Sequence, residues 1–211
     1  MPAILHDQKD ARHTMVLKQL LPRDIVDQRV IGAMEAVERH RFVTPAFVSQ
    51  AYDDTPLPIG FGQTISQPYI VAFMTQALHL SGTETVLEVG AGCGYQSAVL
   101  SLLVKHVYAL EIIAPLVLTA RANLKAAERT NVTVMHGDGY QGSPEYAPYD
   151  AILVAAAAEA VPPALVDQLA EGGRMIIPVG RDIQELWLVR KDKGGISRDM
   201  LLDVRFVPLV H

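Results

Sequence analysis

A glycine-rich loop and three acidic residues are the clearest candidates for chemistry in this sequence. The loop, "GAGCG" at residues 90–94, follows a short apolar run, and Glu88 lies just before it. Glu111 ends a second apolar run, about 20 residues after the loop, and Asp138 ends a third. Glycines let a ligand approach the backbone closely, and carboxylates accept hydrogen bonds from hydroxyl and amino groups. We therefore expect the three carboxylates to project from the same end of neighbouring strands and to form an acidic nucleoside site, better suited to a cation than to a pyrophosphate.

The elements that must position these residues alternate between strand and helix after residue 82. This alternation predicts an α/β fold, in which a mainly parallel, twisted sheet carries helices on both faces. The C-terminal segment predicts two strands around a Lys-Gly-Gly turn, which would form an antiparallel edge of the sheet. The five earlier strands are expected at residues 85–89, 107–111, 131–138, 150–156 and 173–179.

Residues 1–82 do not follow this alternation and predict a helical N-terminal extension packed on the sheet domain. One helix is expected to begin at Asp24, whose side chain could cap it, and another to run from Pro68 to Ser81-Gly82. Between them, the Pro- and Gly-rich stretch at 53–68 predicts an irregular loop. Residues 83–211 would be the Rossmann-like core, and the whole chain one compact domain.

The composition limits the classes of function. The chain has 211 residues, of which 50% are hydrophobic, so a sizeable core is available. Its net charge of −5 argues against nucleic acid as the main partner. The single cysteine, Cys93, cannot form an internal disulfide, and the histidines show no metal-ligand spacing, so we expect no metal. Neither a membrane-spanning run nor a signal peptide is recognisable, which favours a cytoplasmic protein that does not bind membranes.

The spacing of the glycines distinguishes between cofactors. A dinucleotide-binding loop follows the pattern G-x-G-x-x-G, but the third glycine of that pattern is replaced here by Tyr95. This substitution argues against an NAD-linked oxidoreductase. A tight turn that binds nothing is the other alternative. The observed G-x-G-x-G, preceded by an acidic residue, resembles the first motif of S-adenosylmethionine-dependent methyltransferases with a Rossmann-like fold.

Longer stretches resemble one family, protein-L-isoaspartate (D-aspartate) O-methyltransferase, over nearly the whole chain. The glycine loop alone is typical of the superfamily, whereas "PLPIGFGQTIS", "APYDAI" and "VRFVPL" are far more specific. The other matching stretches are "AMEAVERHRFV", "VLEVGAGCGYQSAVLS", "HGDGYQGSPEYAPYDAILV" and "ALVDQLAEGGRMIIPVG".

The resemblance implies a role for each of these segments. Ser66 would be the active-site residue, although it could instead, or in addition, cap the helix that follows. The residues expected to bind the cofactor are Gln63, Thr64, Ile65, Ser66, Glu88, Gly90, Ala91, Gly92, Cys93, Gly94, Tyr95, Glu111, Ile112, Asp138 and Gly139. The residues expected to bind the substrate are Pro58, Ile59, Gly60, Gln63, Thr64, Ile65, Ser66, Val207 and Pro208.

The resemblance also implies an activity. A methyl group would pass from S-adenosyl-L-methionine to the carboxylate of an isoaspartyl or D-aspartyl residue in a damaged protein or peptide, leaving S-adenosyl-L-homocysteine. The methyl ester could then close to a succinimide and so begin repair. We expect a monomer. Three residues, Ala91, Cys93 and Ala155, differ from those common in the family. The alternative functions are a non-catalytic module that binds S-adenosylmethionine or a peptide, and a methyltransferase of other specificity.

Overall fold

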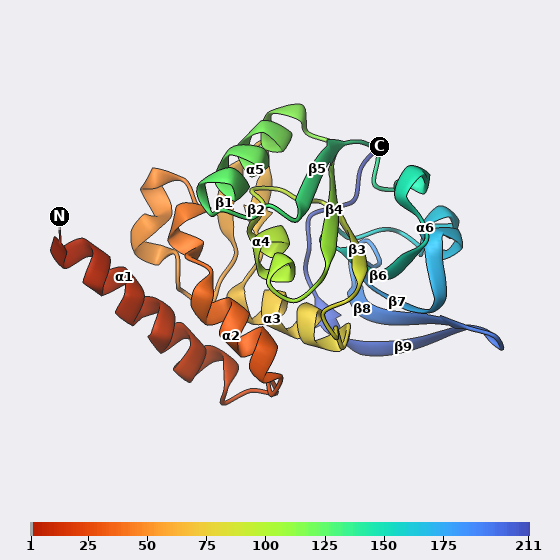
Figure 1. The fold of residues 1–211 in the computed structure, drawn as a ribbon, viewed down its shortest axis with the longest axis horizontal. Helices are drawn as coiled ribbons and strands as arrows, with labels where there is room; N and C mark the ends of the chain where they lie inside the picture. Colours follow the sequence, from red (N-terminus) through yellow and green to blue (C-terminus); the bar gives the residue numbers. More distant parts are fainter. Residues whose placement is uncertain (1) are drawn as a thin grey trace.

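The structure is a computed structural model that describes residues 2–211, with side chains from residue 8 onward (Figure 1). Its α-helices are α1 (Pro2–Met15), α2 (Gln28–Ala36), α3 (Pro68–Ala77), α4 (Tyr95–Ser101), α5 (Ala114–Ala126) and α6 (Pro163–Gln168). Short helical turns occur at Val16–Leu20, Arg39–Arg41, Pro45–Gln50 and Pro144–Tyr146. The strands are β1 (Leu57–Gly60), β2 (Gln63–Ile65), β3 (Thr85–Val89), β4 (His106–Glu111), β5 (Val132–His136), β6 (Tyr149–Val154), β7 (Leu169–Val179), β8 (Gln184–Asp192) and β9 (Gly195–Val204).

Seven of these strands form one sheet in the order β5-β4-β3-β6-β7-β8-β9. The first five are parallel, whereas β8 pairs antiparallel with β7 and β9 antiparallel with β8. The order reverses between β3 and β6, since β4 lies on one side of β3 and β6 on the other. Ligands of open α/β sheets bind outside the carboxyl ends of the strands at such a reversal.

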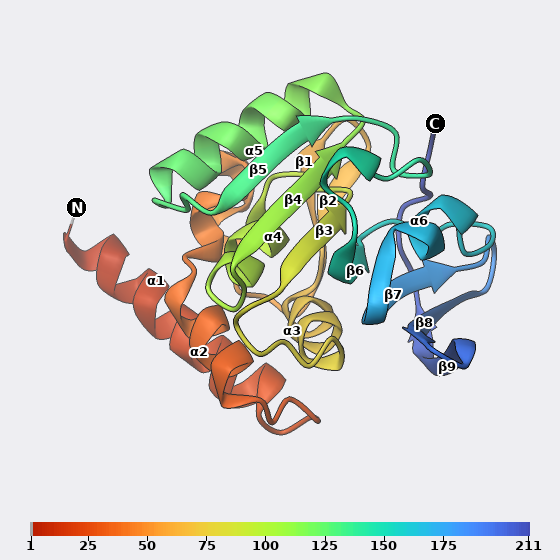
Figure 2. The same ribbon diagram turned by 45° about the vertical axis from the view of Figure 1, so that its right-hand side comes forward.

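Helices cover both faces of the sheet (Figures 1 and 2). Along β3, Val86 faces the larger apolar cluster, which includes residues of α2, α3, α4 and α5. The alternate residues Leu87 and Val89 face a second cluster, which includes Leu165 of α6. Because both faces are buried, β3 is mainly apolar, as is usual for a parallel sheet, with Glu88 as a buried exception.

The N-terminal helices pack against one another beside the sheet. Helix α2 begins three residues later than expected from the sequence, because Asp27 rather than Asp24 is its N-cap. The carboxylate of Asp27 accepts hydrogen bonds from the amides of Arg29 and Val30. The carboxylate of Asp24 instead accepts a hydrogen bond of 2.7 Å from the hydroxyl of Tyr69, which links this segment to α3.

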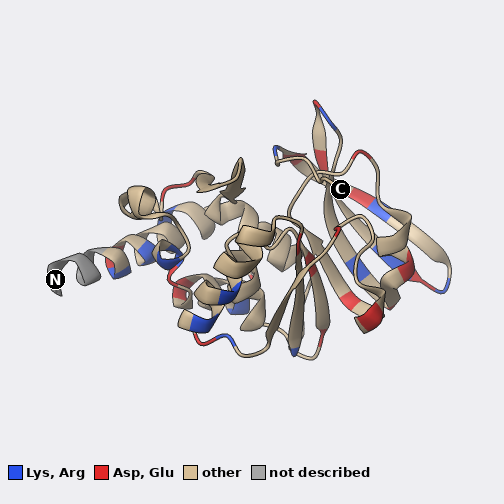
Figure 3. Cartoon of the chain, turned by 90° about the horizontal axis from the view of Figure 1, so that it is seen from above, with Lys and Arg blue, Asp and Glu red and all other residues tan. Residues whose placement is uncertain are grey.

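The segment at 53–68 is more regular than the sequence indicated. Its residues Leu57–Ile65 form a two-stranded antiparallel hairpin, β1–β2, which is separate from the main sheet. Phe61, at the tip, adopts a positive φ of 55° between two glycines that also have positive φ. Within residues 2–211, no helix is long and apolar enough to cross a membrane. Charged residues of both signs are spread over the ribbon (Figure 3).

Candidate functional site

The glycine loop is held at the carboxyl end of β3 by its own backbone. The amides of Gly90 and Ala91 both donate to the carbonyl of Leu110 at the end of β4, at 2.8 and 2.9 Å. The amide of Gly94 donates to the carbonyl of Ala91 at 2.8 Å. Gly90, Gly92 and Gly94 all have positive φ, between 55° and 88°, which explains why glycine occupies each of these positions.

Glu111, the last residue of β4, connects this loop to the neighbouring strand. Its Oε2 accepts a hydrogen bond of 2.8 Å from the amide of Gly92, and its Oε1 accepts one of 2.9 Å from the amide of Ile113. The residue is only 6% exposed. Each carboxylate oxygen can accept a second hydrogen bond, so Glu111 retains two acceptor positions for a ligand.

Asp138 follows β5 and lies in a cluster with two aromatic rings. Its Oδ1 accepts a hydrogen bond from the amide of Tyr140, and its Oδ2 lies 3.0 Å from Nδ1 of His211. The imidazole of His211 stacks on the phenol ring of Tyr140, with 4.2 Å between the centroids. The C-terminal segment is therefore folded back against the end of β5.

Glu88 is not where the sequence placed it. We expected its carboxylate to project from the strand end beside those of Glu111 and Asp138. Instead it occupies the inward-facing position before the last residue of β3 and is fully buried, with Oε2 accepting a hydrogen bond from the hydroxyl of Ser97 in α4. Burial raises the pKa of Glu88 to about 8; the Ser97 hydrogen bond opposes this shift, and the charge of Glu111 adds to it. Glu88 thus lies beneath the loop.

A cavity opens beside the loop; we call it the cofactor cavity. Its lining combines one carboxylate, several backbone segments and apolar side chains, and includes no lysine or arginine. The lining residues are Gln63, Thr64, Val89, Gly90, Gly92, Leu110, Glu111, Ile112, Ile113, Gly137, Gly139, Ala155, Ala156, Val207, Pro208, Leu209 and Val210.

Two further cavities adjoin it. The connecting cavity lies between the glycine loop and β2, and is lined by Thr64, Ile65, Ser66, Val71, Gly90, Ala91, Gly92, Cys93, Tyr95, Gln96 and Ala155. The acceptor groove is lined by Pro56, Thr64, Ser66, Gln67, Ile70, Ala155, Asp203, Val204, Arg205, Phe206 and Val207. Thr64 and Ala155 line all three cavities, so the three spaces meet at these two residues.

Ser66 lies where the connecting cavity meets the acceptor groove. It is not the cap of the following helix, because Gln67 occupies the N-cap position of α3. Pro58, Ile59 and Gly60, which we expected at the substrate, line none of the three cavities. Ile59 instead packs beneath the loop, where a Cβ on Gly92 would lie 3.2 Å from its Cδ1.

The remaining expected residues are distributed around the loop. Gln63, Ile112 and Gly139 line the cofactor cavity together with Val207 and Pro208, whereas Ile65, Ala91, Cys93 and Tyr95 line the connecting cavity. Asp138 lies between the two lining residues Gly137 and Gly139. Gly94 underlies the loop, where a Cβ would lie 3.2 Å from a side-chain carbon of Leu124.

Several lining residues were missed by the sequence analysis. Asp203, Arg205 and Phe206 line the acceptor groove, and Ala156 and Leu209 line the cofactor cavity. The available signal was the stretch "VRFVPLV", which matched the family but from which only two residues were selected. Its apolar alternation could equally have continued a strand.

The lining of the cofactor cavity fits a nucleoside rather than a dinucleotide. Glu111 offers two acceptor positions at a strand end, which suits a pair of vicinal hydroxyls. The absence of lysine and arginine among the lining residues disfavours a pyrophosphate. Position 139 has no room for a larger residue, because a Cβ on Gly139 would lie 2.4 Å from Cγ1 of Val89, which also lines the cavity.

Comparison with known proteins shows the family of the chain. The family model described as protein-L-isoaspartate(D-aspartate) O-methyltransferase (PCMT) matches residues 11–211. The chain belongs to this family. Among curated relatives, a protein-L-isoaspartate O-methyltransferase of Opitutus terrae is 54% identical over 95% of this chain and 87% of its own length. Another, of Vibrio cholerae, is 51% identical over 92% of this chain and 94% of its own length.

Solved structures of PCMT proteins share the fold. One protein-L-isoaspartate O-methyltransferase superposes with a TM-score of 0.87 at 29% identity, covering 95% of this chain and 66% of the other. A beta-aspartate methyltransferase (PCMT) of Plasmodium falciparum, in complex with S-adenosyl-L-homocysteine, superposes with a TM-score of 0.80 at 32% identity. That comparison covers 94% of this chain and 98% of the other. The expected Rossmann-like methyltransferase fold is confirmed.

Proposed function

We propose that this PCMT-family chain methylates the free carboxylate of L-isoaspartyl and D-aspartyl residues in damaged proteins and peptides, with S-adenosyl-L-methionine as the methyl donor. The observation that carries the proposal is the meeting of the cofactor cavity and the acceptor groove at Thr64 and Ala155. A donor in one space and a peptide in the other would have their reacting atoms in contact at that point, as direct transfer requires.

In the proposed complex, Glu111 accepts hydrogen bonds from the two ribose hydroxyls. Asp138, beside Gly139, accepts one from the adenine amino group, for which it exchanges its contact with His211. Gln63, Thr64 and the wall formed by Val207 and Pro208 enclose the donor. When bound, S-adenosyl-L-methionine supplies a methyl group activated by its positively charged sulfur.

The lining residues explain how transfer proceeds without a general base. A carboxylic acid with a pKa of about 4 is already ionised at neutral pH, so the nucleophile needs no deprotonation. Its oxygen attacks the methyl carbon as the bond from that carbon to sulfur breaks, and the electron pair remains on the sulfur. No histidine or lysine lines the described cavities, and burial raises the pKa of Cys93 to about 11, which keeps this thiol neutral.

The chain therefore has to position the reactants and exclude water. Ser66, between the connecting cavity and the acceptor groove, would donate a hydrogen bond to the acceptor carboxylate and orient it. The hairpin β1–β2 would hold the acceptor main chain, with Thr64 and Ile65 next to the donor. Pro58 and Gly60 would contact the peptide only outside the three cavities.

We further propose the wider setting of this activity. The chain would act as a cytoplasmic monomer on protein substrates, without nucleic acid, membrane or metal. The lone, buried Cys93 is compatible with a reducing compartment. Residues 1–82 would serve as a helical extension that carries the substrate segment 53–68, and residues 83–211 as the Rossmann-like core, both within one compact domain.

The test is a methyl-transfer assay with labelled S-adenosyl-L-methionine and two peptides that differ only in an isoaspartyl or an aspartyl linkage. We expect methylation of the isoaspartyl peptide to exceed that of the aspartyl peptide by orders of magnitude. Equal methylation would overturn the substrate assignment and leave a methyltransferase of other specificity. If the protein binds S-adenosyl-L-homocysteine but transfers no methyl group to either peptide, the protein is a non-catalytic binding module.

A further inference from the structure

Arg39 is an unusual residue in this fold, because its charged side chain is fully buried and forms no ion pair with any side chain from residue 8 onward. Its exposed fraction is 0%. Nε donates a hydrogen bond of 2.7 Å to the carbonyl of Ala51, but the two terminal nitrogens have no hydrogen-bond partner among the described residues. Burial lowers the pKa of Arg39, while neighbouring groups, Tyr95 first among them, favour the charged form. An arginine nevertheless remains protonated in proteins.

The guanidinium lies directly behind the wall of the connecting cavity. It is placed over the ring of Tyr95, with 5.0 Å from its central carbon to the ring centroid. Cys93 and Tyr95 both line the connecting cavity, so Arg39 faces that cavity across one layer of side chains.

The connecting cavity has no cationic side chain in its own lining, and most amides of the glycine loop are already hydrogen-bonded. No lysine or arginine lines the connecting cavity or the cofactor cavity. The amides of Gly90, Ala91 and Gly94 donate to backbone carbonyls, and that of Gly92 donates to Glu111. Four of the five loop amides are therefore occupied, and among the described residues the amide of Cys93 and the first amides of α4 remain for an anionic group. Arg39 adds a buried formal charge behind them, whereas Arg205 lines the adjoining acceptor groove.

We propose that Arg39 is a positioning residue for the cofactor, and that its buried charge attracts the carboxylate of the cofactor's amino-acid part into the connecting cavity. This inference rests on the proposed function, since it assumes that the nucleoside part occupies the cofactor cavity. With the ribose at Glu111, the amino-acid part extends along Gly90 and Gly92, which line both cavities, towards Cys93. The charge of Arg39 can act through the one layer of side chains that separates it from the connecting cavity, because little water screens a charge buried in a medium of low dielectric constant.

The experiment compares two ligands that differ only in the carboxylate. S-adenosyl-L-homocysteine carries it, and S-adenosyl-3-thiopropylamine lacks it but keeps the amine and the neutral sulfur. Calorimetry would give both affinities for the wild type and for Arg39→Met. We expect Arg39→Met to bind S-adenosyl-L-homocysteine about 5- to 50-fold more weakly, the range of a charge interaction at low screening. Arg39→Met should bind S-adenosyl-3-thiopropylamine as tightly as the wild type or more tightly, because the positive charge that repels the ligand's ammonium group has been removed.

A matched control is Arg29→Met. Arg29 also donates its guanidinium hydrogen bonds to backbone carbonyls, those of Leu80 and Leu103, but at the opposite end of the sheet. This variant should leave the ratio of the two affinities unchanged. If Arg39→Met does not fold, Arg39→Gln keeps a donor for the carbonyl of Ala51 and removes the charge, and the same ratio is measured.

The ratio of affinities separates the possible outcomes. A loss of affinity that is equal for both ligands would show that Arg39 only maintains the structure, and would overturn the inference. An unchanged ratio in a folded Arg39 variant would overturn it as well. If the wild type binds neither ligand, the proposed function fails instead.

Discussion

Replacement of Glu111 by alanine is the sharpest test of the cofactor site. The residue is 6% exposed, and each of its carboxylate oxygens already accepts one backbone hydrogen bond, which fixes the orientation of the carboxylate. One acceptor position remains on each oxygen, so two charge-assisted hydrogen bonds to the ribose would be lost in the variant. Such bonds contribute about 1.5–3 kcal/mol each, but water solvates the hydroxyls in the free ligand and part of the gain is offset.

We therefore expect Glu111→Ala to weaken the binding of S-adenosyl-L-homocysteine by about 2–4 kcal/mol, which corresponds to about 30- to 700-fold. Calorimetry with the 2′-deoxy and 3′-deoxy analogues shows whether the loss arises at the ribose. Each analogue should bind the wild type more weakly than the parent ligand does, whereas Glu111→Ala should bind all three alike. Unchanged affinity in the variant, or an equal effect of the missing hydroxyl in both proteins, would refute the placement of the ribose at Glu111.

Three other substitutions test different parts of the site. Ser66→Ala should lower turnover about 10- to 1,000-fold, the scale of losing one well-placed donor, with little change in cofactor affinity; full activity in a kinetic assay would contradict a role for this hydroxyl. Glu88→Gln tests the raised pKa of Glu88, which is about 8 when folded. Between pH 5 and pH 8 the unfolded chain releases this proton and the folded chain keeps it, so the stability of the wild type falls with rising pH, by a few kcal/mol. In denaturant unfolding, the free energy of unfolding of Glu88→Gln should therefore rise relative to that of the wild type between pH 5 and pH 8. Parallel pH profiles of the two proteins would contradict the prediction. Gly139→Ala would place a Cβ 2.4 Å from Cγ1 of Val89 and should cost about 1–3 kcal/mol of stability as well as cofactor affinity, whereas an unperturbed melting temperature would refute the close contact.

The sequence predicted the sheet better than it predicted the segments around it. Strands β3, β4 and β6 are mainly apolar and largely buried on both faces, and a mainly apolar segment of this length is unfavourable as an exposed loop. The cap of α2 was misplaced because Asp24 and Asp27 are both good caps, and only the packing of Tyr69 against Asp24 decides between them. The hairpin β1–β2 has too few residues for any periodicity to emerge.

The site was predicted in part, for related reasons. The glycine loop, Glu111 and the residues near Ser66 carry local signals, namely positive φ, a strand end and a specific motif. Glu88 was misplaced because successive residues of a strand point to opposite faces of the sheet. A shift of one position along β3 therefore decides whether a carboxylate points towards the ligand or lies beneath the loop. The pairing of β9 with β8 was predicted, but no local pattern shows that its last residues, and Arg205 after them, border the acceptor groove.

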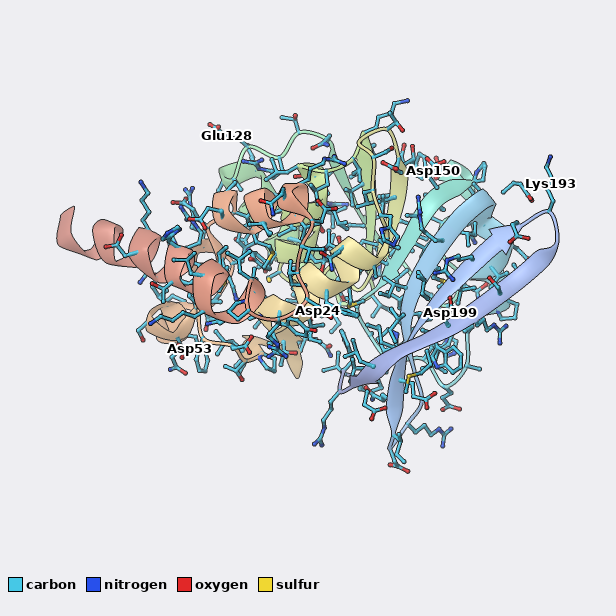
Figure 4. All side chains as sticks on the ribbon, turned by 90° about the horizontal axis from the view of Figure 1, so that it is seen from below. Asp24, Asp53, Glu128, Asp150, Lys193 and Asp199 are labelled. Atoms are coloured by element: carbon cyan, nitrogen blue, oxygen red, sulfur yellow. The ribbon has the colours of Figure 1, made fainter. Side chains whose placement is uncertain are left out.

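Strand β9 forms an edge of the sheet, since it pairs only with β8 among the described strands. Its exposed residues include three charged ones, Arg198 and Asp199 near the turn and Asp203 near the groove, as well as the apolar Ile196 and Met200. Figure 4 labels Asp199 on the strand and Lys193 at the turn. An enzyme that handles aged, partly unfolded chains repeatedly meets extended segments that could add to an open edge and aggregate. Charges along such an edge oppose this pairing. The strand whose end lines the acceptor groove thus carries charges that oppose the addition of an eighth strand, and neutralising these charges should make the protein co-precipitate with its own substrates.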